Sequence, residues 1–462
     1  MSWQTVFSAM LPEHLLLLGM IAILVIDVAS RKPAGATALS LLAVTAAACA
    51  AFLSYANGFS ADAFPGHFSI SPAASLGKAV VLAMAIPVVL MSRDDFFDDP
   101  RFAVLMLSSL YGFCLMLSSD SFLTLFLGLE LMSVPVYVLV LIAFQRPESA
   151  EAALKYLVLG GVATAMFLMG ASLLYGRGGS LALSAFVQGL GSSAPLAIVG
   201  VTMVLIAFFL KAALVPFHAW APDAYEAASV PVTAYMATIV KAGVLLAVLR
   251  LFGSAEANGY LVGLLVALPL ISIVWGNLTA MKQASFRRMI AYSSIAHAGY
   301  LFYAFLGAPE GRYEAIVFYV IAYGLLNLLA FACLPGNDDD VARDRLDNLK
   351  GLFHRQPYAA LMIGIAMLSL AGIPPFPGFV GKFLIFKNVM AAGYTTYAVL
   401  GLLGSYLGIY FYLRVIQFMF MSADAPAGSQ RPVGGMAIGA SVLCLAATTV
   451  LSLFPGLVIG RL

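Results

Sequence analysis

The sequence predicts an all-α polytopic membrane protein, and three observations lead to this fold class. First, 62% of the 462 residues are hydrophobic and only 10% are charged, whereas a soluble domain carries about 25% charged residues. Second, apolar runs of about 20 residues, the length of a helix that crosses a bilayer, recur along the whole chain. Third, the sequence does not show the alternating segments of about ten residues that are typical of a membrane β-barrel.

The polar residues exclude several classes of function. A formal net charge of +2 is too small to indicate binding to nucleic acid. Cys49, Cys114, Cys333 and Cys444 lie singly in apolar runs without CxxC spacing, so we expect them to pack in the core and to bind no metal. No GxxxxGKS/T loop and no GxGxxG after a strand is present. We therefore expect no cofactor in this chain, so an ion gradient or a partner protein must drive any transport.

Each expected span is an apolar run that ends at a charged, glycine-rich or proline-containing loop, and about fourteen such runs occur. In order they are Pro12–Ala29, Thr37–Ala56, Ala73–Met91, Phe102–Leu117, Ser121–Phe144, Ala150–Tyr175, two spans within Ala207–Leu251, Leu261–Met281, Ile290–Leu306, Tyr313–Leu334, Tyr358–Ala391, Tyr397–Met421 and Gly434–Leu453. The first run lacks the basic flank and small-residue cleavage site of a signal peptide, so we expect a retained helix. Gly176–Ser193 and Pro335–Gln356 are expected to be loops.

Lysine and arginine residues are unevenly distributed among the loops, which predicts the orientation of the chain. With the N-terminus outside, thirteen basic residues lie in inside loops and four lie at outside ends. The inside residues are Arg31, Lys32, Arg93, Arg101, Arg146, Lys282, Arg287, Arg288, Arg343, Arg345, Lys350, Arg355 and Arg431, and the outside residues are Arg177, Arg250, Arg312 and Arg461. An even number of spans then places both termini outside.

The stretch Ala207–Leu251 contains the most informative charges. It reads as two apolar spans joined by a proline-broken elbow, with Lys211 in the first span and Lys241 in the second. A charged group at the bilayer centre costs roughly 3 kcal/mol on insertion scales. A break in a helix at membrane depth is tolerated only where protein or a water-filled cavity covers the freed backbone. We therefore expect this stretch to form part of a polar pathway through the membrane.

Three further charged residues extend this set. Glu130 is the only charge in its span, and we expect it to pair with a lysine of another helix; a buried, neutral carboxyl group is the alternative. Lys155 and Lys382 join Lys211 and Lys241 as candidate proton carriers, because the pKa of a buried lysine shifts readily and that of an arginine does not. Lys155 lies near the start of its span, where snorkelling to the interface is the alternative.

Two histidines are candidate relays of protons near neutral pH, namely His218 in the elbow and His297 in the tenth span. Hydrogen-bonded packing explains each of them equally well. Four other charged residues lie near the expected ends of spans, where we expect them to anchor helices at the membrane interface: Asp27, Lys78, Lys387 and Arg414.

A weak internal repeat organises these candidates. A proline-broken span with a lysine occurs at Lys211 and again at Lys382, and each lies roughly eighty residues after an ionisable residue, Glu130 or His297. Two five-helix units with an odd number of spans each must be inverted relative to one another, which is typical of transporters with discontinuous helices. The expected domains are 1–100 (spans 1–3), 101–253 (first repeat), 254–422 (second repeat) and 423–462 (last span), with spans 7 and 12 broken.

Three stretches of sequence also resemble the signatures of a known family. The family comprises the antiporter-like membrane subunits of respiratory complex I (NADH:quinone oxidoreductase) and the related cation/proton antiporters. The stretches are VPFHAWAPDAYEAASVPVTAYMATIVKAGV, RRMIAYSSIAHAGY and LSLAGIPPFPGFVGKF. Within the family, M-type subunits usually have glutamate at the position of Lys382, and L-type subunits have a C-terminal extension for which this chain is too short. The chain is most similar to the N-type subunits of bacteria.

The resemblance implies roles for the candidate residues. Glu130 is expected to be the carboxylate that pairs with Lys211, Lys241 the central channel lysine and Lys382 the lysine on the exit side. Lys155 matches a lysine in the sixth span of N-type subunits. His218 and His297 become relay or linking residues.

The resemblance also implies a function. The chain is expected to translocate protons while other subunits, which hold NADH, FMN, iron–sulfur clusters and quinone, transfer electrons from NADH to quinone. The implied partners are other membrane subunits of the complex, including other antiporter-like subunits, and lipid, in the cytoplasmic membrane of a bacterium with both termini periplasmic. Two alternatives stay open: a subunit of an Mrp-type Na⁺/H⁺ antiporter or a membrane-bound hydrogenase, and a scaffold in which buried charges only hold helices together.

Overall fold

The computed structural model describes residues 3–30, 35–96, 98–143, 147–256, 259–337, 345–421 and 430–460. Almost all of this part of the chain is helical, so the predicted all-α membrane class is confirmed. The basic residues Arg31, Lys32, Arg146, Arg343 and Arg461, used above to predict orientation, lie outside the described residues. The chain divides into two compact units: unit 1 is Met1–Ala212 with Ile239–Asn258, and unit 2 is Ala213–Thr238 with Gly259–Leu462.

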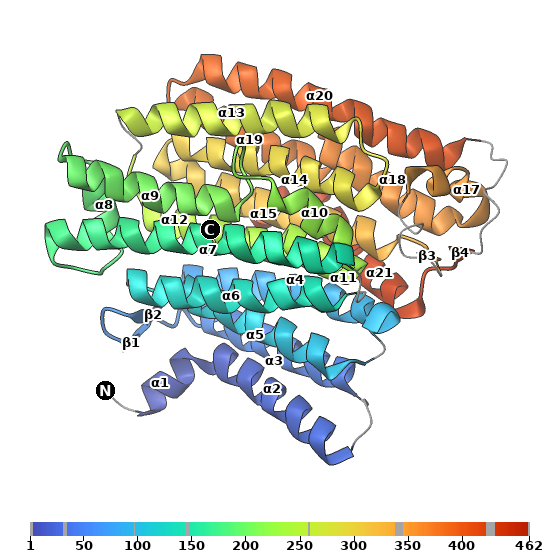
Figure 1. The fold of residues 1–462 in the computed structure, drawn as a ribbon, viewed down its shortest axis with the longest axis horizontal. Coiled ribbons are helices and arrows are strands. Elements are labelled where there is room, and N and C mark those ends of the chain that lie inside the picture. Colours follow the sequence, from blue (N-terminus) through green and yellow to red (C-terminus); the bar gives the residue numbers. More distant parts are fainter. Residues whose placement is uncertain are drawn as a thin grey trace. The chain divides into compact units, whose positions relative to one another are not determined.

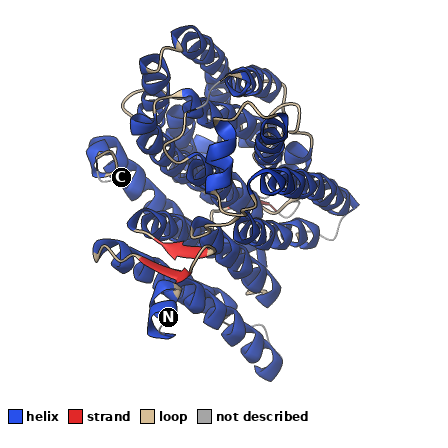
Figure 2. Ribbon diagram, turned by 90° about the vertical axis from the view of Figure 1, so that its left-hand side faces the viewer, coloured by secondary structure: helices blue, strands red, loops and turns tan. Residues whose placement is uncertain are grey.

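Unit 1 is a bundle of long helices with one β-hairpin (Figure 1). Its elements are α1 (Trp3–Ala9), α2 (Leu11–Ser30), α3 (Ala36–Ala56), β1 (Ala61–Phe64), β2 (Phe68–Ile70), α4 (Pro72–Phe96), α5 (Pro100–Leu117), α6 (Phe122–Ile142), α7 (Pro147–Gly178), α8 (Ser184–Leu190), α9 (Pro195–Lys211) and α12 (Lys241–Phe252). Helix α2 packs on α3 and α5, α6 packs on α5 and α7, and α7 packs on α9. The antiparallel hairpin β1–β2 is drawn in red in Figure 2.

Local sequence explains where the central helices of unit 1 begin and how closely they pack. The Asp99 carboxylate accepts a hydrogen bond from the Arg101 backbone N–H at the start of α5, and Ser121 Oγ accepts one from the Thr124 N–H at the start of α6, as N-caps do. A Cβ atom on Gly128 of α6 would lie 2.8 Å from the Met116 backbone nitrogen of α5. Glycine therefore lets the two backbones touch, as small residues do between membrane helices.

Unit 2 contains the remaining elements. Its α-helices and strands are α10 (Trp220–Ala227), α11 (Val230–Tyr235), α13 (Tyr260–Ala280), α14 (Phe286–Tyr303), α15 (Pro309–Ala332), β3 (Gly336–Asn337), α17 (Leu352–Arg355), α18 (Pro357–Ala371), α19 (Pro377–Ala391), α20 (Thr395–Phe420), β4 (Gln430–Arg431) and α21 (Gly435–Leu453), and three short 3-10 helices are Ala304–Leu306, Leu346–Leu349 and Pro455–Leu457. Helix α14 packs on α13 and α10, and α15 packs on α18, α19 and α21. A short π-helical segment, Met236–Val240, joins α11 to α12 of unit 1.

Twelve helices among the described residues are long and apolar enough to cross a membrane, and the bent pair α8 and α9 gives a possible thirteenth span. The expected twelfth span, Tyr358–Ala391, is present as two shorter helices, α18 and α19, separated at Gly372–Phe376. The expected count of about fourteen therefore stays a prediction. The interpretation of Gly176–Ser193 as a loop was wrong, because α7 continues to Gly178 and α8 begins at Ser184.

Candidate functional site

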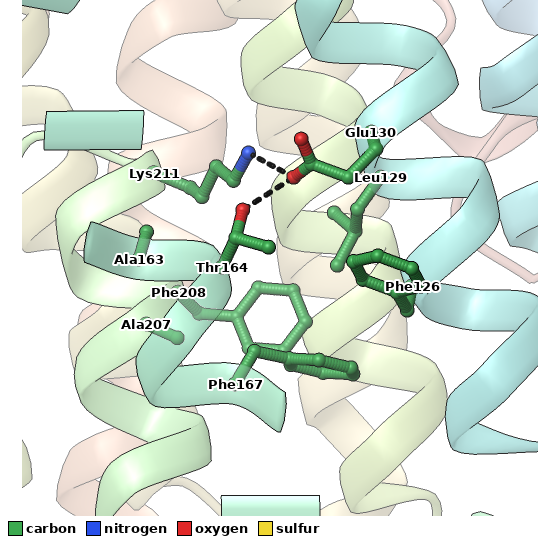
Figure 3. A pocket seen from close by; sticks show the side chains of 9 residues that line it. All are labelled: Phe126, Leu129, Glu130, Ala163, Thr164, Phe167, Ala207, Phe208 and Lys211. Carbon is green, nitrogen blue, oxygen red and sulfur yellow. Dashed lines mark hydrogen bonds and ion pairs between the residues drawn. The ribbon is translucent and has the colours of Figure 1, made fainter. Parts of the chain in front are cut away.

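The structure brings Lys211 and Glu130 together in unit 1. Lys211 is the last residue of α9, and its Nζ atom lies 3.0 Å from Glu130 Oε1 on α6 (Figure 3). The lysine side chain is 7% exposed and the glutamate side chain is 26% exposed. The ion pair expected from the sequence is therefore formed, and the Glu130 side chain is more accessible than the Lys211 side chain.

Hydroxyl groups surround this pair. Thr164 of α7 donates a hydrogen bond from its Oγ1 to Glu130 Oε1 at 2.5 Å, and both partners point toward each other in Figure 3. Lys211 Nζ also donates to Ser133 Oγ at 3.1 Å and to Tyr137 Oη at 3.4 Å. Ser133 and Tyr137 lie one and two turns after Glu130 on α6. The charged pair is therefore held by three helices and by hydroxyls that can both donate and accept.

A small pocket opens beside the pair. It encloses about 230 Å³, including its mouth, and is lined by apolar and aromatic side chains together with the three polar ones. The lining residues are Phe126, Leu129, Glu130, Ala163, Thr164, Phe167, Ala207, Phe208 and Lys211 (Figure 3). An apolar wall lowers the local dielectric constant, so the interaction between the two charges is stronger here than in water.

Thr164→Val is expected to slow proton transfer at this site without unfolding the chain. The substitution keeps the side-chain shape and removes the hydroxyl that donates to Glu130. A hydrogen bond to a charged group contributes about 1.5–3 kcal/mol, so the ionised carboxylate loses that stabilisation. We expect a several-fold lower rate of proton translocation in proteoliposomes that contain the assembled complex.

The matched control for this variant is Thr202→Val. Thr202 lies on α9 and donates only to the backbone carbonyl of Ile198 in the hydrogen bonds described for it, so its hydroxyl does not contact the ion pair. Equal translocation rates for the two variants would contradict the role that we assign to Thr164.

Lys241 is buried at the start of α12. Its residue is 5% exposed, and it follows the π-helical segment Met236–Val240. Such π-helical turns occur mostly inside α-helices, and they are frequent at functional sites. A Cβ atom on Gly243, two residues further on, would lie 2.7 Å from Met132 Sδ of α6, so this end of α12 is tightly packed within unit 1.

Lys382 lies on α19, which follows the break after α18 in unit 2. It is 7% exposed, and its Nζ donates to the backbone carbonyls of Leu370 at 3.0 Å and Ala371 at 3.2 Å. These carbonyls end α18, where the helix dipole favours a positive charge. The ammonium also lies 5.2 Å from the centre of the Tyr300 ring, a distance at which cation–π attraction operates.

His297 lies at the centre of a buried tyrosine network in unit 2. Its Nε2 is 2.9 Å from Tyr412 Oη, and its Nδ1 is 2.7 Å from Tyr319 Oη. Its ring contacts those of Tyr300 and Tyr323. Because Tyr300 also lies beside Lys382, the histidine and the lysine border the same aromatic ring.

His218 lies in the elbow that follows α9 and is outside the tyrosine network of His297. Helix α9 ends at Lys211, and Ala213 adopts a φ of 62°, a left-handed conformation that costs a non-glycine residue about 1–3 kcal/mol. His218 Nε2 then accepts a hydrogen bond from Trp275 Nε1 of α13 at 3.1 Å. His218 and His297 are therefore held by separate sets of contacts within unit 2.

Lys155 lies on the exposed side of α7. Its Nζ is 2.7 Å from Glu151 Oε1 one turn earlier, and the two side chains are 44% and 66% exposed. The structure therefore does not bring it to the buried pair of unit 1, and its role as a relay stays a prediction. Among the described residues no cluster of histidine, cysteine and carboxylate side chains could hold a metal ion.

Sequence reasoning missed several residues. Thr164 and Tyr137 were not singled out, because hydroxyl side chains are common in membrane helices and often bond only within their own helix. Lys78 was expected to anchor a helix at the membrane interface. That expectation was wrong: the residue is fully buried and its Nζ lies 2.6 Å from Glu13 Oε1.

The arrangement can hold and move protons. Unit 1 contains a lysine–carboxylate pair with adjacent hydroxyls and a second buried lysine, and unit 2 contains a buried lysine beside a histidine–tyrosine network. Each of these groups can exist in two protonation states or pass a proton along hydrogen bonds.

Known proteins resemble this chain over most of its length. The family described as "NADH:quinone oxidoreductase/Mrp antiporter, TM" matches residues 119–408. NADH-quinone oxidoreductase subunit N of Pelobacter propionicus is 38% identical over 416 residues, which cover 89% of each chain. The subunit N of Granulibacter bethesdensis is 34% identical over 462 residues, covering 96% of this chain and 95% of the relative.

Solved structures show the same fold. A chain in respiratory complex I from Thermus thermophilus with bound aureothin superposes with a TM-score of 0.85 at 34% identity, covering 97% of this chain and 98% of that one. A chain of the archaeal membrane-bound sulfane sulfur reductase (TM-score 0.87, 24% identity, 100% and 97% covered) and one of the Mrp complex from Dietzia sp. (0.85, 20% identity, 98% and 96% covered) share the fold.

Proposed function

The chain belongs to the family of membrane subunits shared by NADH:quinone oxidoreductase and Mrp antiporters, and from this premise we propose that it is the proton-translocating N-type subunit of an NADH:quinone oxidoreductase. Relatives that carry the name subunit N and align over nearly the whole chain support this assignment. Lysine rather than glutamate at position 382 supports the N type within the family. Electron transfer from NADH to quinone takes place in partner subunits, which hold NADH, FMN, the iron–sulfur clusters and the quinone.

The Glu130–Lys211 pair is the observation that carries the proposed mechanism. While the two groups are 3.0 Å apart, each stabilises the charged form of the other. A conformational or electrostatic signal from the partner subunits that separates them leaves a buried ammonium group without its anion, and burial disfavours the charged form. Lys211 then releases its proton, and the next acceptors are Lys241 and Lys382. His218, His297 and Lys155 are secondary relay candidates.

Two inverted five-helix repeats, residues 101–253 and 254–422, would place one broken helix in each repeat. The pairs α9/α10 and α18/α19 support this proposal, because each surrounds a proline-containing break with a buried lysine at one side. Discontinuous helices in corresponding positions are the usual location of an ion path in transporters built from repeats.

The same assignment implies a membrane location, an orientation and a set of partner subunits for the chain. We place the chain in the cytoplasmic membrane of a bacterium with both termini periplasmic, as the thirteen inside and four outside basic residues support. Its partners are the other membrane subunits of the complex, other antiporter-like subunits among them, and lipid. This chain itself binds no redox cofactor in the proposed cycle.

Purification of the tagged chain from mildly solubilised membranes tests the assignment. We expect an assembly that contains iron–sulfur clusters and reduces quinone with NADH to co-purify. Recovery only with small membrane proteins, without oxidation of NADH but with Na⁺/H⁺ exchange in vesicles, would replace the proposal with an Mrp-type antiporter.

A further inference from the structure

A second buried ion pair lies in unit 1, among the first helices of the chain. Lys78 Nζ of α4 is 2.6 Å from Glu13 Oε1 of α2, and the two side chains are 0% and 1% exposed. Within the described part of the chain, Glu13 Oε2 is buried and has no hydrogen-bond partner. The pair is therefore more deeply buried than Glu130–Lys211, and one carboxylate oxygen of Glu13 accepts no hydrogen bond among the described residues.

Stability alone gives little reason for such a pair. Replacing a buried ion pair with apolar residues of similar volume is often neutral or stabilising, because taking two charges out of water is costly. Helices α2 and α4 already pack on both α3 and α5, so the four-helix contact does not depend on these charges. The presence of a carboxylate and an amine at this position therefore indicates that their charges serve a function other than stability.

Few other titratable groups face the pair. Tyr111 and Cys114 of α5 lie close enough to interact electrostatically with Glu13. His14 points elsewhere, because its Nδ1 contacts the Met10 carbonyl and its ring packs on Phe7. Neither a tyrosine nor a buried thiol carries a charge near neutral pH, so Glu13 and Lys78 are the charged groups of this cluster.

The pair lies near the β-hairpin of unit 1, and two serines precede Lys78 at that end of α4. Ser75 lies one turn before Lys78 on α4, on the same face of the helix, and its Oγ is 3.1 Å from Ser54 Oγ of α3. Ser71 immediately precedes α4, and its Oγ accepts a hydrogen bond from the Ala74 N–H. The Phe68 ring of β2 lies 5.0 Å from Lys78 Nζ. One aromatic ring of the hairpin therefore lies over the lysine, and Ser71 and Ser75 precede Lys78 in the sequence at the start of α4.

From this arrangement we propose that Glu13 and Lys78 form a second proton-holding site, which loads and releases one proton in each cycle of translocation. The ion pair carries one exchangeable proton, on Lys78. Uptake of one proton converts the Glu13 carboxylate to a neutral carboxylic acid, and release of that proton restores the ion pair. This inference rests on the proposed function, because it adds a site to the same translocating chain.

The decisive variant is Glu13→Gln with Lys78→Met in one chain, compared with each single substitution. A single substitution leaves one buried charge without its partner, so we expect less assembled complex. The double variant removes both charges with little change in volume, so we expect normal assembly and normal oxidation of NADH by an artificial acceptor. Proton translocation per NADH oxidised is nevertheless expected to be partly lost. Lys387→Met, which removes an exposed lysine of α19, is the matched control and should translocate normally.

A double variant that translocates as many protons per NADH as the unchanged protein would show that the pair only clamps α2 to α4. The Glu130→Gln/Lys211→Met double variant, measured in parallel, separates this failure from failure of the proposed function. If that variant loses translocation while the Glu13/Lys78 variant does not, only the second site is wrong. If both translocate normally, protons take a route that uses neither pair, and failure of the proposed function is shown separately by the purification experiment above.

Glu13→Asp is the reserve variant if the double variant does not assemble. It keeps the carboxyl group and shortens the side chain by one methylene. A proton-holding site predicts an altered pH profile of translocation in the assembled complex, whereas a clamp predicts an unchanged profile in whatever fraction assembles.

Discussion

Lys211→Met is expected to abolish NADH-driven proton translocation through this chain. Methionine has a similar length and fills the space beside Ser133 and Tyr137, but it carries no exchangeable proton. It also leaves Glu130 without its cation, and loss of one partner of a buried pair costs about 3–5 kcal/mol; the 26% exposure of Glu130 reduces that cost. The measurement is acidification or alkalinisation of proteoliposomes on addition of NADH, with oxidation of NADH recorded in the same sample.

Two controls separate chemistry from assembly. Glu130→Gln/Lys211→Met removes both charges, so we expect it to restore the amount of assembled complex but not translocation. Lys387→Met removes an exposed lysine and is expected to behave as the unchanged protein. Full translocation by the Glu130/Lys211 double variant would mean that protons take a route that avoids this pair.

Gly378→Ala is expected to destabilise unit 2 and to disturb Lys382 at the same time. A Cβ atom at residue 378 would lie 1.9 Å from the Ser369 carbonyl oxygen, which is a backbone atom of α18 and cannot rotate away. Overpacking of this kind costs about 1–3 kcal/mol and occasionally more. Gly378 lies one turn before Lys382 on α19, so a shift of α19 also pulls the ammonium from the Leu370 and Ala371 carbonyls.

The amount of chain in the membrane and its thermal unfolding measure this effect. Gly364→Ala is the matched control, because Gly364 lies inside α18 and no neighbouring atom would come within 4 Å of an added Cβ. Removing glycine from the interior of a helix stabilises it by roughly 0.5–1 kcal/mol. Equal accumulation and equal unfolding temperatures for the two variants would contradict the tight approach of α18 and α19.

The charged part of the candidate site could be predicted because charge is costly in a membrane. Glu130 and Lys211 each stand alone in an apolar run, and that isolation favoured a partner on another helix. The structure joins them at 3.0 Å. The helical class and the breaks near Pro216 and Pro374 followed from composition and from proline in the same way.

The uncharged residues of the candidate site, and the second ion pair outside it, could not be predicted from the sequence. Nothing in the sequence distinguishes Thr164, which bonds Glu130 from α7, from Thr202, which bonds its own helix. Lys78 is only six residues from the start of α4, a position that normally allows a lysine to snorkel. Its burial depends on the hairpin that folds over it and on Glu13 of α2, and both are tertiary contacts without a local pattern.

The exchange of segments between the two units has a consequence for biosynthesis. Unit 1 needs α12, which packs on α5, α8 and α9, so it is incomplete until the ribosome has passed residue 258. By then α10 and α11 of unit 2 are already synthesised. Their carboxylates Asp223 and Glu226 meet Arg288 only when α14 follows. The ribosome adds 62 residues between Glu226 and Arg288, which at about 5–20 residues per second takes several seconds. During that time the two carboxylates exist before the arginine that pairs with them.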